Sequence, residues 1–175
     1  MPNIQEFLNK GLPNRVRNNH ALEHATLHVL QGKGIAGRFG GISDAGGFWI
    51  YGDTETETLL MAAQEALIRL SDGESALAVH PNCGTNLAVG SLAAGVLAWI
   101  GMRGTRGSAG RRLARLPIAV MMGIIGYQLA MPLGPKIQEQ VTTNADVSGM
   151  EVVQVLRHDV GSGITVHRVS TRTTR

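Results

Sequence analysis

The sequence predicts an α+β head built from both flanks of a two-helix transmembrane hairpin. Three observations support this fold class. Two stretches in the middle of the 175-residue chain are almost wholly apolar, and the stretch between them contains five arginines and no acidic residue. The segments before and after this pair alternate between helix-like and strand-like patterns.

The two apolar stretches read LAVGSLAAGVLAWIGM, from Leu87 to Met102, and LPIAVMMGIIGYQLAMPLGP, from Leu116 to Pro135. At ~1.5 Å per residue, roughly 20 residues of this kind cross the ~30 Å hydrocarbon core of a bilayer. Buried helices of a soluble bundle would normally carry a polar stripe, and neither stretch has one. We therefore predict two membrane-spanning helices, whose glycines let them approach each other closely.

The connection between the two spans, RGTRGSAGRRLAR, accounts for the formal net charge of +3. Short loops with this much positive charge remain in the cytoplasm, so we predict an integral membrane protein with a cytoplasmic loop. The expected partner of this charge is the lipid bilayer with its anionic headgroups, and not nucleic acid. No cleavable signal peptide opens the chain, so roughly 80 residues would have to cross the membrane ahead of the first span.

The N-terminal flank begins with a predicted helix and a strand. Asn18 or Asn19 can cap a helix that runs to about Leu30 and ends at the glycines of QGKG. GFWIY has the aromatic and β-branched content of a strand, and it follows a turn around Asp44 to Gly47.

The remaining head elements follow from local patterns in both flanks. Thr54 and Glu57 form a capping box for a second helix that should lie on the sheet. SALAVH predicts a second short strand, and EVVQVLR and ITVHRV, joined by a turn in DVGSG, predict a β-hairpin. His158 and His167 are expected to be exposed strand residues, and the final STRTTR is expected to be disordered.

Because the two spans form a hairpin, both flanks emerge side by side and are expected to complete one head. The predicted divisions are the N-terminal part of the head at residues 1–83, the first span at 84–102, the basic loop at 103–115, the second span at 116–135 and the C-terminal part of the head at 136–175.

HALEHATLH places three histidines four residues apart on the first predicted helix. Residues at this spacing share one face, and two imidazoles at positions i and i+4 can converge on one metal ion. Glu23, next to His24, can reach a water bound to an ion that His20 and His24 hold. We therefore expect His20 and His24 to be metal ligands, Glu23 to be a catalytic general base, and zinc to be the cofactor.

A third ligand is expected from HPNCGTN, where the second predicted strand meets the first span. Catalytic zinc keeps three protein ligands, preferably imidazole or thiolate, and an open position. His80 or Cys83 would complete such a set with His20 and His24. Four closed ligands, with both His80 and Cys83 engaged, would instead indicate a structural metal site.

Other roles for the same residues stay open. The histidines can form an ordinary polar helix surface, and His80 with its neighbours can form the turn that caps the first span. Cys83, at a helix N-terminus, can be a nucleophile with His80 or His24 as its base and Asn82 or Asn86 orienting the imidazole. A bis-histidine haem between the spans is disfavoured because neither span contains histidine.

HALEHATLHVL, HPNCGTN and a segment beginning PLGPKIQEQVTT together resemble a family of small bacterial membrane proteins classed as a domain of unknown function. This resemblance spans most of the chain and implies the membrane hairpin and a pairing of the two polar motifs, but no established activity. We expect the protein to lie in the bacterial inner (plasma) membrane. Locally, His20-Ala-Leu-Glu23-His24 fits H-x-x-E-H and resembles inverzincin metallopeptidases, in which the two histidines bind zinc and the glutamate is the general base. The third inverzincin ligand is a glutamate far downstream in a large domain, which this chain is too short to hold.

The predicted function is a zinc-dependent hydrolase that acts at the membrane surface, with a peptide or protein as substrate. A peptidase needs a groove for an extended chain, and the Gly-rich strand region could supply an edge for one. The alternative is a non-catalytic membrane assembly or interaction protein, whose histidines and cysteine form a structural metal site or a packed polar cluster.

Overall fold

The computed structural model describes residues 4–35, 39–104, 109–159, 161 and 165–174. The chain divides into two compact units, one made of Met1–His80 and Gln138–Arg175, the other of Pro81–Ile137. We call the first unit the head and the second the helical hairpin. The predicted α+β class is confirmed, because a four-stranded antiparallel sheet is accompanied by helices that include two long apolar ones.

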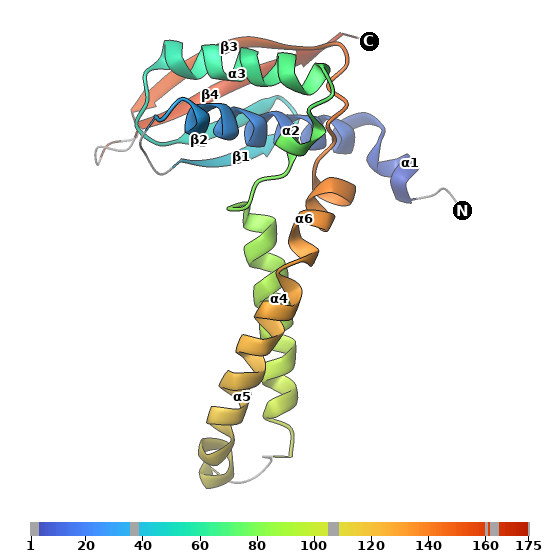
Figure 1. Cartoon of the computed structure of the whole chain (residues 1–175), viewed down its shortest axis with the longest axis vertical. Coiled ribbons are helices and arrows are strands. Elements are labelled where there is room, and N and C mark those ends of the chain that lie inside the picture. The colour runs from blue at the N-terminus through green and yellow to red at the C-terminus, as the bar shows by residue number, and fades with distance from the viewer. Residues whose placement is uncertain (1–3, 36–38, 105–108, 160, 162–164, 175) are drawn as a thin grey trace. The chain divides into compact units, whose positions relative to one another are not determined.

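The sheet of the head has the strand order β1-β2-β4-β3, and each neighbouring pair is antiparallel (Figure 1). The strands are β1 at Gly40–Asp44, β2 at Gly47–Tyr51, β3 at Met150–Asp159 and β4 at Thr165–Thr173. The predicted turn between Asp44 and Gly47 is present, since these two residues close the β1–β2 hairpin. The predicted hairpin of the C-terminal flank is also present as β3 and β4, and the middle of the predicted turn lies outside the described residues.

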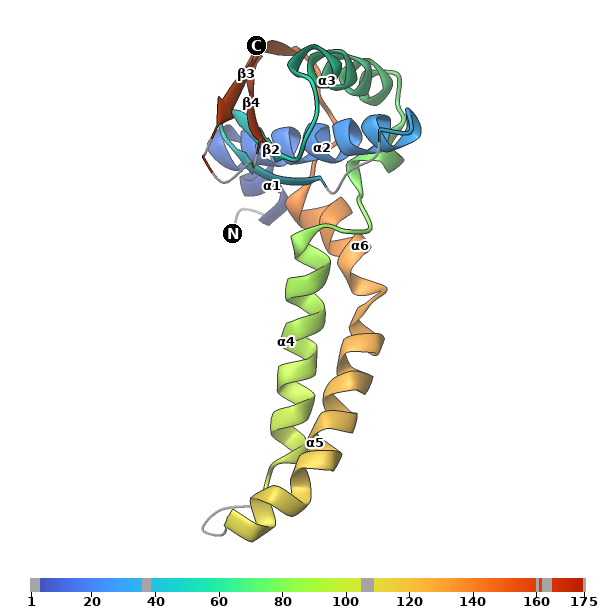
Figure 2. The same ribbon diagram turned by 90° about the vertical axis from the view of Figure 1, so that its left-hand side faces the viewer.

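Helices α2 and α3 pack side by side on one face of this sheet, as Figure 2 shows. The head contains the short helix α1 at Ile4–Leu8, α2 at Gly11–Gly32, and α3 at Thr56–Ser71. The hydrophobic core between helices and sheet includes the fully buried side chains of Leu22, Leu30, Phe48, Ile50 and Leu59. The placement of the predicted second helix on the sheet is therefore confirmed.

The first long helix begins earlier than predicted. α2 starts at Gly11, so Asn18 and Asn19 are not caps but buried residues inside the helix. The amide of Asn18 bonds a distant segment, since Nδ2 donates to the carbonyls of Asn144 and Asp146 at 3.0 and 2.6 Å. An asparagine whose side chain has such partners can lie inside a helix and need not bond the free N–H groups at its N-terminus.

The capping box predicted at Thr54 is also wrong. α3 begins at Thr56 with Glu55 as its N-cap, and the Glu55 side chain makes no capping hydrogen bond. The Thr56 hydroxyl lies 3.2 Å from Nε2 of His167. The start of α3 is therefore fixed by contact with β4 and not by a local capping motif.

The segment SALAVH is not a strand. Its first four residues, Ser75–Ala78, form a 3₁₀ turn (η1), and Val79 after it is extended. The carbonyls of Ala78 and Val79 accept hydrogen bonds from imidazoles of α2 in place of a neighbouring strand. A short apolar run of this kind is ambiguous between strand and helix on periodicity alone.

Two expectations for the C-terminal flank are corrected. The segment STRT is not disordered but belongs to β4, where Thr171 pairs with Val152 and Thr173 with Met150. His167 is not exposed but completely buried, because it pairs with Ile50 on the side of the sheet that faces the helices. The expected exposure of His158 is confirmed.

The helical hairpin consists of α4 at Gly84–Gly101, α5 at Ala109–Ala130 and the short α6 at Leu133–Ile137. Both α4 and α5 are long and apolar enough to cross a membrane. They pack against each other (Figures 1 and 2). α5 begins seven residues before Leu116, so the first two turns of this helix carry arginines that were expected in the loop. A π-helical turn at Gln138–Thr142 follows α6 and belongs to the head.

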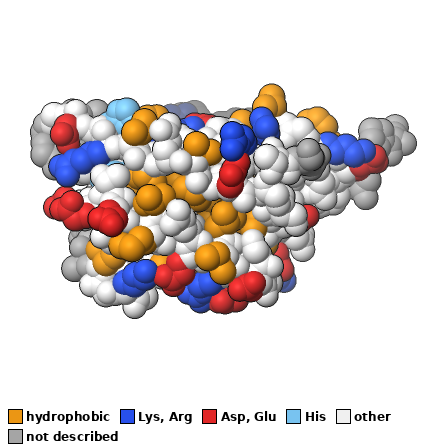
Figure 3. All heavy atoms as spheres, turned by 90° about the horizontal axis from the view of Figure 1, so that it is seen from above, with side chains coloured by type: hydrophobic (Ala, Val, Ile, Leu, Met, Phe, Trp, Pro, Cys, Tyr) orange, Lys and Arg blue, Asp and Glu red, His pale blue; other side chains and the backbone are white. Residues whose placement is uncertain are grey.

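Charge is distributed unequally between the two units. Residues 81–137 contain six Lys or Arg and no Asp or Glu, whereas the rest of the chain contains ten basic and thirteen acidic residues. On the face of the head that carries α3 and β3, Figure 3 shows acidic, basic and apolar side chains interspersed. The net positive charge therefore belongs to the hairpin alone.

Candidate metal centre

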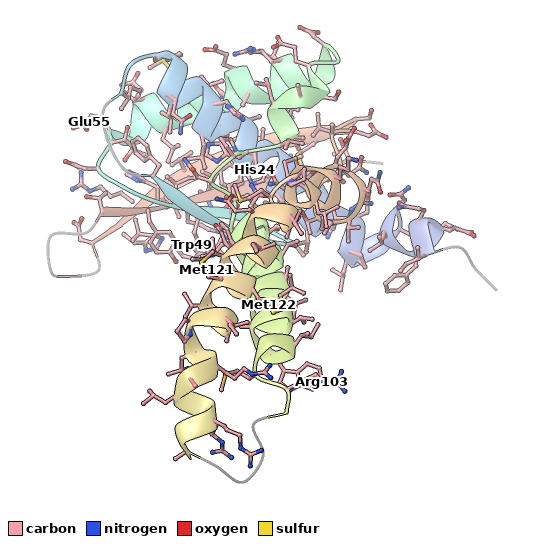
Figure 4. The ribbon with its side chains drawn as sticks, turned by 60° about the horizontal axis from the view of Figure 1, so that its bottom comes forward. His24, Trp49, Glu55, Arg103, Met121 and Met122 are labelled. Carbon is pink, nitrogen blue, oxygen red and sulfur yellow. The ribbon has the colours of Figure 1, made fainter. Side chains whose placement is uncertain are left out.

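Helix α2 presents His20, His24 and His28 at successive turns. His24 is only 1% exposed, whereas His20 and His28 are half-buried. The ring centroids of His20 and His24 lie 4.3 Å apart, so the i, i+4 spacing brings these two imidazoles together. Figure 4 labels His24, which lies inside the head.

The backbone holds both rings of this pair in the same tautomer. Nδ1 of His20 lies 2.9 Å from the carbonyl oxygen of Thr142, and Nδ1 of His24 lies 2.7 Å from that of Ala78. A carbonyl oxygen can only accept a hydrogen bond, so Nδ1 must be the protonated nitrogen in each ring. In the neutral rings the lone pair therefore lies on Nε2, which is the form that binds a metal through Nε2.

His80 packs against the same cluster, with its ring centroid 5.7 Å from that of His24 and 4.8 Å from that of His28. Burial, followed by the charges of His28 and His24, lowers the pKa of His80 from 6.5 to about 4. The ring is therefore neutral at pH 7. Nε2 of His80 lies 3.3 Å from the amide nitrogen of Gln31, which donates, so the Nε2 lone pair of His80 is used in this contact.

His28 has the opposite tautomer to His20 and His24. Its Nε2 lies 2.9 Å from the carbonyl oxygen of Val79, so Nε2 carries the proton and the lone pair lies on Nδ1. The histidines of the cluster are thus not equivalent. Among the described histidines, only His20 and His24 have Nδ1 hydrogen-bonded to a backbone carbonyl.

Glu23 contacts the edge strand β1. Its carboxylate is almost completely buried, and Oε2 accepts a hydrogen bond from the Ser43 hydroxyl at 2.6 Å. Gly41 lies directly against the same carboxylate, because a Cβ added to Gly41 would be 2.3 Å from Oε1. The amide of Asn19, one turn earlier on α2, donates to the carbonyl of Asp44 at 2.7 Å and fixes the end of this strand. Strand β1 is therefore held along α2 at Asn19 and at Glu23.

Cys83 is the N-cap of α4 in the helical hairpin, where its sulfur accepts from the Thr85 N–H at 3.4 Å. The thiol is buried. Cys83 follows His80 by three residues, so their α-carbons are no more than ~11 Å apart even in a fully extended chain.

Two comparisons place the chain among known proteins. The profile of the family described as "Domain of unknown function (DUF6391)" matches residues 15–155, a range that contains both HALEH and HPNCGTN. The chain belongs to this family. An uncharacterized protein of Picosynechococcus sp. is 32% identical over 159 residues, which cover 82% of this chain and 70% of the relative. No solved structure matches the chain.

Membership of DUF6391 brings no activity, so the chemistry must be argued from the residues of this chain. Sequence patterns led to the paired histidines but missed the groups that orient them, which are the carbonyls of Ala78 and Thr142. Every residue has a carbonyl, so no pattern could have identified these two. Gln31 was within reach of the sequence argument, because it lies on the same face of α2, seven residues after His24. Ser43 had no recognisable signal.

Proposed function

We propose that this DUF6391 protein is a membrane-anchored, zinc-dependent hydrolase in which His20 and His24 bind the metal through Nε2. The observation that carries the proposal is the pair of hydrogen bonds from Nδ1 of these rings to backbone carbonyls. Metal-ligating histidines nearly always donate their second ring nitrogen in this way, which fixes both tautomer and ring orientation. A polar surface cluster would not need backbone carbonyls directed at two adjacent rings.

Cys83 is the better candidate for the third ligand. Imidazole nitrogen and thiolate sulfur are the donors that zinc prefers, and Cys83 follows His80, whose ring packs against His24, by only three residues. The alternative third ligand, His80, would first have to give up the contact between its Nε2 and Gln31. Three protein ligands leave one position for water or substrate, as in catalytic zinc sites.

Glu23 is the proposed general base. A zinc ion held by the two neighbouring histidines would supply Lewis acidity and lower the pKa of a bound water to ~7. Glu23 would accept the proton of the attacking water, and the Ser43 hydroxyl would hold the carboxylate in place until then. β1 is an edge strand of the described sheet, so an extended peptide could pair beside it. A peptide or protein is therefore the proposed substrate.

The proposed location is the bacterial inner membrane, with α4 and α5 crossing the bilayer. Both helices are apolar over a sufficient length, and the arginines around their connection would keep that end in the cytoplasm. The head would then be made from both flanks of a membrane-spanning hairpin and act at the membrane surface.

A second candidate is a non-catalytic assembly protein with a structural metal site. The burial of His24 and Glu23 favours this alternative, because a catalytic centre must admit water and substrate. Substitution of Glu23 by glutamine separates the two. The Glu23→Gln protein should keep its metal and lose turnover if Glu23 is the base, whereas a structural site has no turnover to lose.

The first experiment is metal content by elemental mass spectrometry on detergent-purified protein. About one zinc per chain is expected for the wild type, with loss in His24→Ala and in Cys83→Ser. His158→Ala, which removes an exposed histidine of β3, is the matched control and should keep the metal. A wild-type protein without stoichiometric metal after growth in zinc-supplemented medium would rule out the hydrolase proposed here. If Cys83→Ser keeps the metal, His80 and not Cys83 is the third ligand.

A further inference from the structure

The loop end of the helical hairpin, where α4 ends and α5 begins, carries a concentration of exposed arginines. We call this set the basic end; its described members are Arg103, Arg111, Arg112 and Arg115. No carboxylate occurs anywhere in residues 81–137 to neutralise it within the hairpin. Arg103 projects outward from the end of α4 in Figure 4.

The packing of α4 against α5 determines how far along the hairpin axis each of these arginines lies. A Cβ added to Gly101 of α4 would lie 3.0 Å from the α-carbon of Ala119, so these two residues are opposite each other. Arg103 is two residues beyond Gly101, and Arg115 is one turn beyond Ala119 towards the loop. At ~1.5 Å per residue the two arginines lie within a few ångströms of the same level. Arg111 and Arg112 lie about one turn further out.

The apolar part of α4 is shorter than an average bilayer core. Sixteen residues, from Leu87 to Met102, separate Asn86 from Arg103, which corresponds to ~24 Å of helix compared with ~30 Å of hydrocarbon. The second apolar stretch is longer, with twenty residues from Leu116 to Pro135. Arg103, and Arg115 at nearly the same level, would therefore lie at or near the boundary of the hydrocarbon, where a guanidinium needs a phosphate or water as partner.

Trp99 marks the same level on α4. The guanidinium carbon of Arg103 lies 5.4 Å from the centre of the exposed Trp99 ring. Tryptophan is enriched where hydrocarbon meets headgroups, and arginine binds phosphate through a planar fork of donors. The two side chains together have the chemistry of a lipid phosphate contact, with the ring beside the acyl chain and the guanidinium at the headgroup.

We propose that the basic end binds the headgroups of anionic phospholipids, with Arg103 and Arg115 contacting lipid phosphate at the level of Trp99. The occupant follows from charge complementarity, since this end offers positive charge alone at the depth where lipid phosphates lie. This inference rests on the membrane-spanning hairpin of the proposed function but is independent of any metal or hydrolysis.

The test uses the fluorescence of Trp99 as the only tryptophan, excited at a wavelength that tyrosine does not absorb. The chain has two tryptophans, so Trp49→Phe in the head leaves Trp99 alone. The full-length Trp49→Phe protein is reconstituted into vesicles of phosphatidylcholine and phosphatidylglycerol, in which either the neutral or the anionic lipid carries brominated acyl chains. Brominated phosphatidylglycerol should quench Trp99 more strongly, with an association preference of roughly fivefold or more at low salt. The preference should fall in 0.5 M NaCl, which screens exposed charges.

The variants separate the basic end from charge in general. Arg103→Gln combined with Arg115→Gln should lower the preference towards one, whereas Lys136→Gln, which removes the basic residue of α6, should leave it unchanged. Circular dichroism checks that the variants keep their helices. Equal quenching by the two lipids in the Trp49→Phe protein would overturn the inference, as would an equal loss of preference in Lys136→Gln. If neither brominated lipid quenches Trp99, the membrane assignment falls together with this inference.

Discussion

The side-chain amide of Gln138 forms two hydrogen bonds with the backbone of His80. The His80 N–H donates to Oε1 at 2.9 Å, and Nε2 donates to the His80 carbonyl at 3.1 Å. Gln138 is completely buried. The chain leaves the head after His80 and re-enters it at Gln138, so this amide joins the two points at which the hairpin departs and returns.

Gln138→Ala should therefore destabilise the head by about 2–4 kcal/mol, because it leaves a buried N–H and a buried carbonyl without their partner. Urea unfolding of the detergent-purified protein, followed by circular dichroism, measures the change. Gln140→Ala is the matched control, since Gln140 is an exposed glutamine of the same turn that bonds Gln5 and Arg17 through its backbone carbonyl. A Gln138→Ala protein as stable as Gln140→Ala would contradict this role.

The contact between Gln138 and His80 illustrates what the sequence can and cannot predict about this fold. Elements with a strong local pattern were predictable, such as the strand GFWIY and the two apolar helices, because periodicity and composition reflect local burial. Elements decided by distant partners were not. Asn18 is a good helix cap by composition, yet its amide bonds the carbonyls of Asn144 and Asp146. No local pattern contains that information.

The same division applies to the candidate metal centre. The closeness of the His20 and His24 rings follows from helix geometry alone and was predictable. Their orientation depends on Ala78 and Thr142, which come from segments far along the chain. The strand predicted over SALAVH would have placed the Ala78 carbonyl in a sheet. The observed 3₁₀ turn is what leaves this carbonyl available to His24.

A second prediction concerns Gly41 and Glu23. Gly41→Ala would place a methyl group 2.3 Å from the present position of Oε1 and force the carboxylate to move. In the hydrolase proposed above, zinc content should remain, while the rate of peptide hydrolysis should fall by roughly a hundredfold, within the range that a positioned general base contributes. Hydrolysis of a peptide mixture, followed by mass spectrometry, and metal analysis give the two readouts.

Gly40→Ala is the control for this substitution, because a Cβ on Gly40 would meet nothing within 4 Å. Ser43→Ala should lower the rate in the same direction, and Ser43→Thr, which keeps the hydroxyl, should restore it. Equal rates in Gly41→Ala and Gly40→Ala would show that the position of Glu23 does not matter for turnover.

A third prediction tests the packing within the helical hairpin. A Cβ on Gly126 of α5 would lie 2.7 Å from the Ala93 carbonyl oxygen of α4, so Gly126→Ala must push two backbones apart. We expect a loss of about 1–3 kcal/mol, the usual cost of overpacking. Thermal unfolding in detergent measures it. Gly95→Ala, where a Cβ would meet nothing within 4 Å, should be neutral or slightly stabilising because alanine favours helix. Equal stability of the two variants would mean that α4 and α5 do not pack this closely.

The last prediction concerns the pH dependence of stability and the buried His167. This ring is completely buried, and Nδ1 has no hydrogen-bond partner among the described residues. Burial and then the charge of Arg157 lower the pKa of His167 below 6.5, against smaller opposing effects of Glu55, Asp159 and Asp53. Below about pH 6.5 the unfolded chain therefore binds a proton that the folded head does not. The neutral His167 ring therefore makes its full contribution to the free energy of unfolding above this pH. The free energy of unfolding decreases as the pH falls below it.

His167→Leu removes the titrating ring. The free energy of unfolding of this variant should therefore decrease less between about pH 6.5 and pH 5 than that of the wild type. A difference of one between the pKa values of His167 in the folded and the unfolded chain corresponds to ~1.4 kcal/mol in the free energy of unfolding. Urea unfolding across this range, on protein freed of metal with a chelator, measures the dependence without a contribution from metal release. Part of the decrease should persist, because the pKa of His80 is also lowered, to about 4. His158→Gln, which removes an exposed ring on β3, should leave the decrease unchanged. A pH profile of His167→Leu that matches that of the wild type would show that His167 already titrates normally in the folded head.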